Sequence, residues 1–346
     1  MRTVSSYREM LQNYRGRASR PDVFDAFWAQ TCSLNEPEVT EVQKAPVSSA
    51  SLVCEEFTCR ASDGVFLKVH TLRPAGATPR PTVVLYTDLG RKARGWLHLA
   101  RFASLGFAVV APETRELPAK AHALFEKAWK GEVSAPELAA YGFSTSATRV
   151  AGAEDAPAAM DMAGAMSAAA ATDAAITELA RATPLFQLIS DAYAVARAAQ
   201  SLPYVAADCL MTWGEGLGGT LALDIAALLG PECAGMMAQN PFFADSVDIA
   251  AEKLFGAEAA LKNAQVISAF SLLDTTSFAE KVTCPTLMAC SLEDQASPPE
   301  GTFAAYNRIP ATCKRIAVYP KHAHERINDF ENLQIDFLLT RSGGRL

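Results

Sequence analysis

Apolar and polar residues alternate along positions 52–73, and a Ser-Asp-Gly run at 62–64 interrupts the alternation. A period of two is typical of a strand with one buried face, and Asp-Gly pairs favour tight turns. The pattern therefore predicts a β-hairpin with strands at 54–59 and 65–72.

Further along the chain, short continuous apolar runs replace the alternation. The first two runs, 82–86 and 107–111, flank a helical pattern at 95–105, which is the rhythm of parallel strands joined by helices. The rhythm resumes after residue 190, with strands expected at 209–212, 233–238, 286–291 and 314–319 and helices at 191–201, 220–229, 301–309 and 328–339. The sequence therefore predicts an α/β fold with a mostly parallel central sheet and helices on both faces.

Two regions depart from this rhythm. Residues 1–50 are expected to form an N-terminal extension, in which a helical pattern at 22–28 presents aromatic side chains to the main domain. An Ala-rich stretch at 117–185 is expected to be an inserted helical cap. Within it, helices are expected at 119–130 and 172–182. The simplest organisation is one domain over 51–340 that carries both additions.

Charge and cysteine content narrow the function classes. The formal net charge of −7 and the pI of about 5.4 argue against a nucleic-acid-binding protein. Eight cysteines without a C-x-x-C pair argue against a zinc site and fit a reducing compartment, so we expect no metal or other cofactor. The N-terminus lacks the apolar region of a signal peptide, and no run reaches the roughly 18 apolar residues of a membrane helix. We therefore expect no membrane span and a cytoplasmic location.

Candidate chemistry begins at a glycine-rich turn between a predicted strand and a predicted helix, where residues 213–219 read Trp-Gly-Glu-Gly-Leu-Gly-Gly. A strained strand-to-helix bend of the form G-x-S-x-G exposes a nucleophilic serine in many hydrolases. Gly214 and Gly218 hold the flanking positions, but the central position is Gly216, which has no side chain. A plain glycine-rich turn is an alternative. A phosphate-binding loop does not fit because no Gly-Lys-Ser/Thr follows, and a dinucleotide fingerprint is disfavoured so far into the chain.

Two further candidates follow later strands. Asp294 comes after the strand expected at 286–291, where a carboxylate can orient an imidazole, and His324 follows the next strand. Taken alone, the aspartate fits a turn or helix cap equally well, and the histidine fits a structural role. The order of bend, acid and histidine is that of the catalytic triad in α/β-hydrolases. The three positions together therefore predict the α/β-hydrolase fold.

The chain resembles the acetyl xylan esterase and cephalosporin C deacetylase family of α/β-hydrolases. The resemblance rests on the helix expected at 22–28, on the bend at 213–219 and on three later segments. These segments read Asp-x-x-x-Pro-Pro at 294–299, Phe-Ala-Ala-Tyr-Asn at 303–307 and, from Val-Tyr to His-Glu, residues 318–325. It implies that Asp294 is the acid, that His324 is the general base and that Gly216 stands at the serine position. It also implies an oxyanion hole formed by the backbone N–H groups of Leu89 and Leu217.

The family resemblance further implies a small ester or an acylated sugar as ligand. Because the resembled family forms rings, it also implies a homo-oligomer, and a purely structural role in such an assembly is a third, weaker hypothesis.

Three departures from the family pattern fall on the catalytic parts: Gly216, Leu217 and the Thr-Asp-Leu segment at 87–89. Asp88 would bring a carboxylate to the place where negative charge develops in acyl transfer, which opposes catalysis. We therefore expect a protein that is inactive as a serine esterase and that acts by binding a ligand or a partner. The alternative is a carboxylic-ester hydrolase that uses Asp294 and His324 with another nucleophile, for which Glu215, Ser144 and Ser146 are the candidates.

Overall fold

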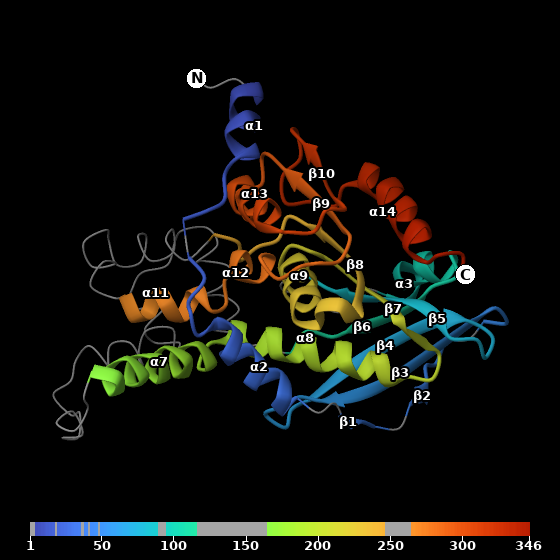
Figure 1. Ribbon diagram of the computed structural model, residues 1–346. Helices are drawn as coiled ribbons and strands as arrows, with labels where there is room; N and C mark the ends of the chain where they lie inside the picture. The colour runs from blue at the N-terminus through green and yellow to red at the C-terminus, as the bar shows by residue number, and fades with distance from the viewer. Residues whose placement is uncertain are drawn as a thin grey trace.

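The computed structural model describes residues 4–17, 19–35, 38–40, 42–47, 49–88, 95–115, 165–245 and 264–346. Within them the chain forms one ten-stranded sheet in the order β1-β3-β4-β6-β5-β7-β8-β9-β10, with β2 paired to β3. Helices cover both faces of this sheet (Figure 1). This arrangement confirms the α/β architecture with helices on both faces that the sequence predicts.

One edge of the sheet is antiparallel. The predicted hairpin is present, because β3 (Leu52–Arg60) pairs antiparallel with β4 (Phe66–Pro74). Two short strands, β1 (Glu38–Val39) and β2 (Gln43–Lys44), add to the outer side of β3. On its inner side, β4 pairs antiparallel with β6 and so joins the hairpin to the rest of the sheet.

The remaining strands run parallel to one another, and all of them except the edge strand β10 are largely buried. They are β5 (Arg80–Tyr86), β6 (Ala108–Pro112), β7 (Val205–Glu215), β8 (Cys233–Gln239), β9 (Thr286–Ser291) and β10 (Lys314–Tyr319). Because they are parallel, their carboxyl ends meet at one edge, which is where ligands bind in open α/β sheets. The strand predicted at 209–212 is longer than expected, since β7 includes residues on both sides of it.

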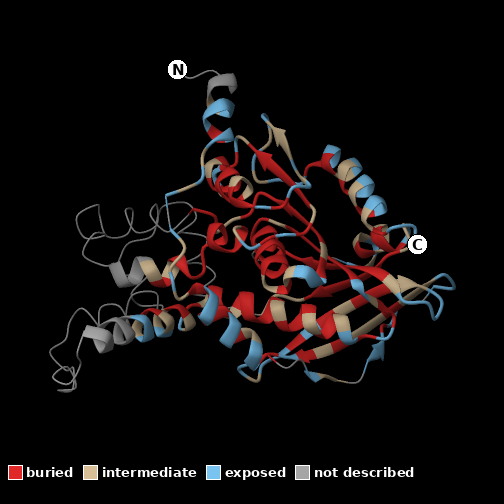
Figure 2. Cartoon of the chain, in the orientation of Figure 1, coloured by how far each residue is buried: buried red, intermediate tan, exposed pale blue. Residues whose placement is uncertain are grey.

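Two apolar cores lie on opposite faces of the sheet, and burial is deepest between sheet and helices (Figure 2). The first core contains Trp28, Phe186 and Phe278, and the second contains Trp213 and Phe330. The first face is covered by α2 (Phe24–Leu34), α8 (Pro184–Ser201), α9 (Leu217–Leu229) and α12 (Thr275–Ala279), and the second by α3 (Trp96–Ala103) and α14 (Asn328–Arg341). The other described helices are α1 (Val4–Gln12), α7 (Ala165–Arg181), α11 (Ala264–Ser271), α13 (Pro299–Arg308) and the 3-10 turn η2 (Gly230–Glu232).

The N-terminal segment contacts the main domain along much of its length, and two side-chain hydrogen bonds illustrate this. The indole N–H of Trp28 donates to the carbonyl of Leu272 at 2.9 Å, so the predicted aromatic helix is anchored in the first core. The phenol of Tyr7 on α1 donates to Glu300 on α13 at 2.7 Å. The boundary proposed near residue 50 stays a prediction.

The proposed cap lies largely outside the described residues, which include neither the helix expected at 119–130 nor anything else between 116 and 164. The helix expected at 172–182 falls within α7. The helix expected at 191–201 begins earlier, at Pro184, because the hydroxyl of Thr183 caps it by accepting the N–H of Phe186 at 3.1 Å. Among the helices of the described part, none is long and apolar enough to cross a membrane.

Candidate active site

A single residue, Gly216, separates β7 from α9 and forms the bend predicted from the sequence. Its backbone has φ +57° and ψ −122°, a conformation that glycine adopts without the steric cost that a Cβ imposes. The N–H of Gly216 donates to the carbonyl of Gln239 on β8 at 2.9 Å, which fixes the bend at the carboxyl edge of the sheet. The centre of the bend therefore presents backbone only.

The two flanking glycines are required by the close approach of strand and helix. A Cβ on Gly214 would lie 2.0 Å from the carbonyl oxygen of Gly218, and a Cβ on Gly218 would lie 2.3 Å from that of Tyr86. Both distances are far below van der Waals contact and both involve backbone atoms that cannot turn aside. The bend thus has the tight geometry that a strand-to-helix nucleophile position needs.

Asp294 and His324 are brought together as the sequence predicts. Nδ1 of His324 lies 2.8 Å from Oδ2 of Asp294, whose side chain is fully buried. The other oxygen of Asp294 accepts the backbone N–H groups of Ala296 and Ser297 at 2.9 and 2.8 Å. Because one oxygen is held by the backbone, the other is aimed at the imidazole and fixes the orientation of its ring.

The opposite side of the imidazole contacts a second carboxylate. Nε2 of His324 lies 3.1 Å from Oδ2 of Asp88, which follows β5 and whose side chain is only 8% exposed. Oδ1 of Asp88 accepts the backbone N–H of Leu217, the first residue of α9, at 3.0 Å. A Cβ built on Gly216 would lie 2.1 Å from this same Oδ1. The carboxylate of Asp88 therefore fills the space above the bend.

Two carboxylates around one imidazole favour its protonated form. Burial alone lowers the pKa of His324, but the hydrogen bonds and negative charges of Asp294 and Asp88 outweigh burial and raise this pKa to about 9. At neutral pH the cluster is an imidazolium between two carboxylates, with both ring nitrogens donating. A histidine in this state is an acid, and it cannot take a proton until one of its partners loses its charge.

Hydrogen bonds between strand ends hold the loops that carry these groups. The side-chain amide of Asn240, after β8, donates to the hydroxyl of Ser291 at 3.0 Å and accepts the Ser291 backbone N–H at 2.8 Å. The amide of Gln239 donates to the carbonyl of Glu325 at 2.7 Å, next to His324. The acid and the histidine are thus positioned from a neighbouring strand as well as from their own.

The predicted oxyanion hole differs from expectation at Leu217. Its N–H was expected to point at a substrate oxygen, but it is already donated to Asp88. Leu89, the other predicted donor, lies outside the described residues, as do the alternative nucleophiles Ser144 and Ser146. Glu215 ends β7, one residue before the bend, and is half-buried. The sequence placed Asp88 near the site, but nothing in the sequence showed that it fills the nucleophile's space.

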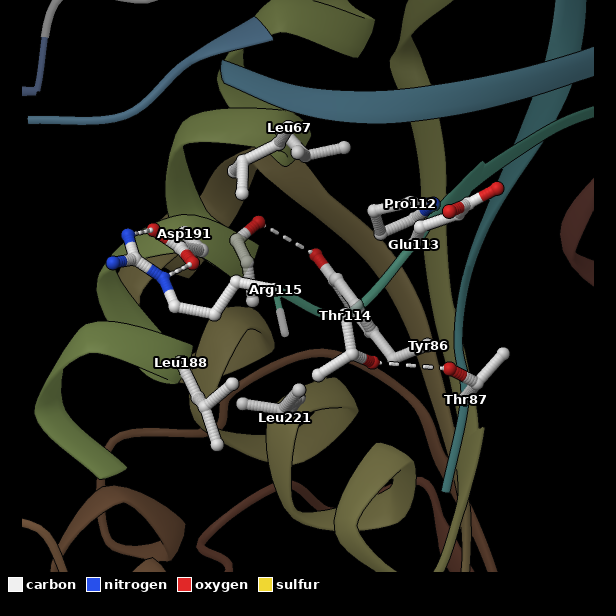
Figure 3. A pocket seen from close by; sticks show the side chains of 12 residues that line it. Leu67, Tyr86, Thr87, Pro112, Glu113, Thr114, Arg115, Leu188, Asp191 and Leu221 are labelled. Carbon is white, nitrogen blue, oxygen red and sulfur yellow. Dashed lines mark hydrogen bonds and ion pairs between the residues drawn. The ribbon is translucent and has the colours of Figure 1, made fainter. Parts of the chain in front are cut away.

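A pocket is lined by Tyr86 and Thr87, the two residues that precede Asp88 in the chain (Figure 3). Its lining mixes apolar side chains with polar and charged ones, among them Glu113 and the threonines Thr87 and Thr114, whose hydroxyls are 3.2 Å apart. Arg115 closes one end by pairing with Asp191, as the dashed lines in Figure 3 show. The pocket is small, with space for roughly one water molecule.

The cluster does not resemble a metal site. Among the described residues, no group of three or more His, Cys, Asp or Glu side chains is arranged to hold a metal ion. An imidazole that hydrogen-bonds a carboxylate through each nitrogen also has no lone pair directed at a cation. The sequence-based expectation of a site without metal or cofactor stays a prediction.

Comparisons with known proteins show the family through a sequence model and the fold through solved structures. The sequence model of the acetyl xylan esterase family matches residues 1–133 and 175–341. The structure is similar to acetyl xylan esterase 1 from Thermoanaerobacterium sp. JW/SL YS485, with a TM-score of 0.72, 20% identity and coverage of 96% of this chain and 98% of that one. It is similar to the acetyl xylan esterase from Paenibacillus sp. R4 with a TM-score of 0.71 and the same identity and coverage. A cold-adapted esterase from an Arctic intertidal metagenomic library matches with a TM-score of 0.51, 13% identity and coverage of 87% and 99%.

Proposed function

The chain belongs to the acetyl xylan esterase family, and from this premise we propose that it does not hydrolyse esters through a nucleophile at the bend but binds a small ester or an acylated sugar. The observation that carries the proposal is the placement of Asp88. Its carboxylate stands where a serine at position 216 would project, and it contacts both Leu217 N–H and His324.

The bend lacks a nucleophilic side chain. Acyl transfer needs a side-chain oxygen or sulfur at the bend, within reach of the imidazole, and Gly216 offers none. Triad members act as a unit, so loss of the serine costs on the order of 10⁶ in turnover and leaves roughly 10³ to 10⁴ over water. This remaining activity is too small for a metabolic esterase.

The charge of Asp88 also opposes acyl transfer at the bend. The transition state of acyl transfer develops negative charge on the carbonyl oxygen, and backbone N–H groups must be open to receive it. Here the Leu217 N–H is donated to Asp88. A carboxylate at that point also repels the developing charge. The loss of activity therefore has two independent causes, at Gly216 and at Asp88.

Binding is supported by what remains around the site. The acid and the histidine keep their positions, and the pocket at Thr87 combines apolar side chains with hydroxyl and charged groups, a lining that suits part of a small polar ligand. The similar structures from Thermoanaerobacterium and Paenibacillus are described as acetyl xylan esterases, which makes an acylated sugar the first ligand class to test. The cytoplasmic location expected from the sequence belongs to the same proposal.

Hydrolysis of 4-nitrophenyl acetate by the purified chain and by a His324→Ala variant tests the catalytic half. We expect equal, near-background rates for both proteins, whereas a His324-dependent turnover of about 1 per second or more would overturn the proposal. Titration calorimetry with an acetylated xylo-oligosaccharide tests the binding half. Saturable heat is expected with the wild type, and absence of heat with this and with small esters would contradict ligand binding.

A further inference from the structure

Three of the eight cysteines lie at the amino end of the parallel sheet, opposite the edge that carries the candidate site. Cys233 begins β8, Cys284 lies two residues before β9, and Cys313 lies one residue before β10. These three strands are consecutive in the sheet order. All three residues are free thiols, and Cys233 and Cys284 are buried whereas Cys313 is exposed. The amino end of the sheet therefore carries cysteines that the proposed function does not use.

The two buried members of this group are direct neighbours. Both side chains belong to the first core, so they project from the same face of the sheet. The backbone N–H of Met236 on β8 donates to the carbonyl of Pro285 at 2.9 Å, which ties the two chain segments together beside the cysteines. The thiol of Cys284 is hydrogen-bonded to that of Cys233. Neighbouring strands lie about 4.8 Å apart, within the roughly 4.4 to 6.8 Å that separates the Cα atoms of a disulfide, so their spacing suits such a bond.

The hydrogen bond makes the two thiols chemically unequal. It lowers the pKa of Cys233, because the S–H that Cys284 donates stabilises negative charge on the Cys233 sulfur. The same contact raises the pKa of Cys284, and burial raises this pKa further. The thiolate is the nucleophile in cysteine chemistry. Cys233 is therefore the reactive member of the pair, and Cys284 keeps its proton.

The other buried cysteines of the described chain differ from this pair. Burial raises the pKa of each, and the neighbouring groups that also shift it are acidic, basic or hydroxyl side chains and not thiols, for Cys54, Cys59, Cys209 and Cys290. Cys290 lies inside β9 and is fully buried. It is therefore a matched control, a buried thiol on the same strand without a thiol partner.

We propose that Cys233 and Cys284 form a redox switch, in which hydrogen peroxide joins them by a disulfide that locks β8 to β9. The proposal is independent of the proposed function, because it involves neither the bend nor His324. The two side chains are only 3% and 5% exposed, so an oxidant that reaches them in the folded chain must be about as small as water. Hydrogen peroxide meets this requirement, and a bulky aromatic disulfide does not.

The oxidation takes two steps. The Cys233 thiolate attacks one oxygen of hydrogen peroxide, the O–O bond breaks and hydroxide leaves with the electron pair, so Cys233 becomes a sulfenic acid. The sulfur of Cys284 then attacks the sulfenic sulfur, the S–O bond breaks, and the thiol proton of Cys284 leaves with the hydroxyl group as water. The hydroxide of the first step takes the proton that Cys233 released on ionisation. The net reaction converts two thiols and one hydrogen peroxide into one disulfide and two water molecules.

The disulfide closes a long loop in the middle of the chain. The loop runs from residue 233 to residue 284 and includes α11 and α12. Closing it removes conformational entropy from the unfolded chain, which favours the folded one. Oxidation is therefore expected to stabilise the protein, and reduction is expected to reverse the effect.

Peptide mapping of the wild-type full chain tests the disulfide itself. The folded protein is treated with hydrogen peroxide, the peroxide is removed, and the remaining thiols are alkylated with iodoacetamide under denaturing conditions before mass spectrometry. We expect a Cys233–Cys284 disulfide, with Cys290 recovered as an alkylated thiol. Dithionitrobenzoate, the bulky oxidant, should modify the exposed Cys313 and leave the pair reduced. Absence of the disulfide in folded protein, or its formation only in urea-unfolded protein, would overturn the proposal.

Urea unfolding tests the lock on the two strands. The equilibrium constant for unfolding of the peroxide-treated wild type should be at least about 10-fold smaller than that of the reduced protein, and dithiothreitol should restore the reduced value. Cys284→Ala should abolish this difference, whereas the matched Cys290→Ala should keep it. A difference of equal size in the two variants would show that another site is oxidised and would contradict the switch. Because the mapping uses the wild type alone, a variant that fails to fold leaves the proposal open to disproof.

Discussion

The carboxylate of Asp88 stands where a side chain on Gly216 would lie. A Cβ on Gly216 would be 2.1 Å from Oδ1 of Asp88. The two positions come from different strands, β5 and β7, which pair in parallel so that their carboxyl ends lie side by side. A side chain at one position therefore excludes the carboxylate at the other.

This exclusion predicts coupling between the two residues. Gly216→Ala alone should lower the free energy of unfolding by about 3 kcal/mol, because the new methyl group collides with Asp88 in a backbone conformation that already disfavours a Cβ. In an Asp88→Ala background the same change should cost clearly less, giving a coupling of about 2 kcal/mol. Urea unfolding of the wild type, the two single variants and the double variant measures this coupling energy. Additive effects of the two substitutions would show that the collision is relieved by other movements of the structure.

The charge on His324 predicts a pH dependence of stability. Its pKa is raised from 6.5 to about 9 in the folded protein, so its stabilising contribution is complete below pH 6.5 and is lost as the pH rises through 9. The upper limit of this loss is on the order of 3 kcal/mol. Urea unfolding between pH 6 and pH 10 should show a steeper decline for the wild type than for His324→Gln. Parallel curves would contradict a protonated His324.

Arg115 predicts a strong effect at the rim of the pocket. Its guanidinium pairs with Asp191 at 2.6 Å and with Asp63 at 2.7 Å, and burial raises the pKa of Asp191 to about 6 despite this pairing. Arg115→Gln leaves a buried carboxylate without its cation, which should cost about 3 kcal/mol in urea unfolding.

A matched control for Arg115 is Arg345, which pairs with Asp208 at the surface at 2.6 Å, with both side chains more than half exposed. Arg345→Gln should leave the unfolding free energy nearly unchanged, because solvent screens an exposed ion pair. Equal losses for the two variants would mean that burial of Asp191 does not set the cost.

The close packing at the bend predicts that Gly218 tolerates no side chain. Its Cβ would lie 2.3 Å from a backbone oxygen of Tyr86, so Gly218→Ala should destabilise the protein by about 3 kcal/mol or more. Gly95 is a suitable control because a Cβ there meets nothing within 4 Å, and Gly95→Ala should cost about 1 kcal/mol or less. Thermal unfolding of both variants compares them, and a stable Gly218→Ala protein would contradict the described bend.

The sequence predicted most of the sheet because its strands are short apolar runs between helical patterns, as β5 and β9 illustrate. The bend at Gly216 and the pairing of Asp294 with His324 could also be predicted from the sequence, because both depend on local motifs at strand ends. The position of the Asp88 side chain could not be predicted from the sequence. It depends on how the end of β5 lies against the start of α9, a contact across 129 residues that no local pattern reports.

Asp88 occupies the nucleophile's place while Asp294 and His324 stay in position for acid–base chemistry. An Asp88→Ala/Gly216→Ser double variant tests this most directly, by its initial rate with 4-nitrophenyl acetate. We predict a His324-dependent rate at least about 100-fold above the wild type, with each single variant close to the wild type. A folded double variant that shows no gain would contradict the account.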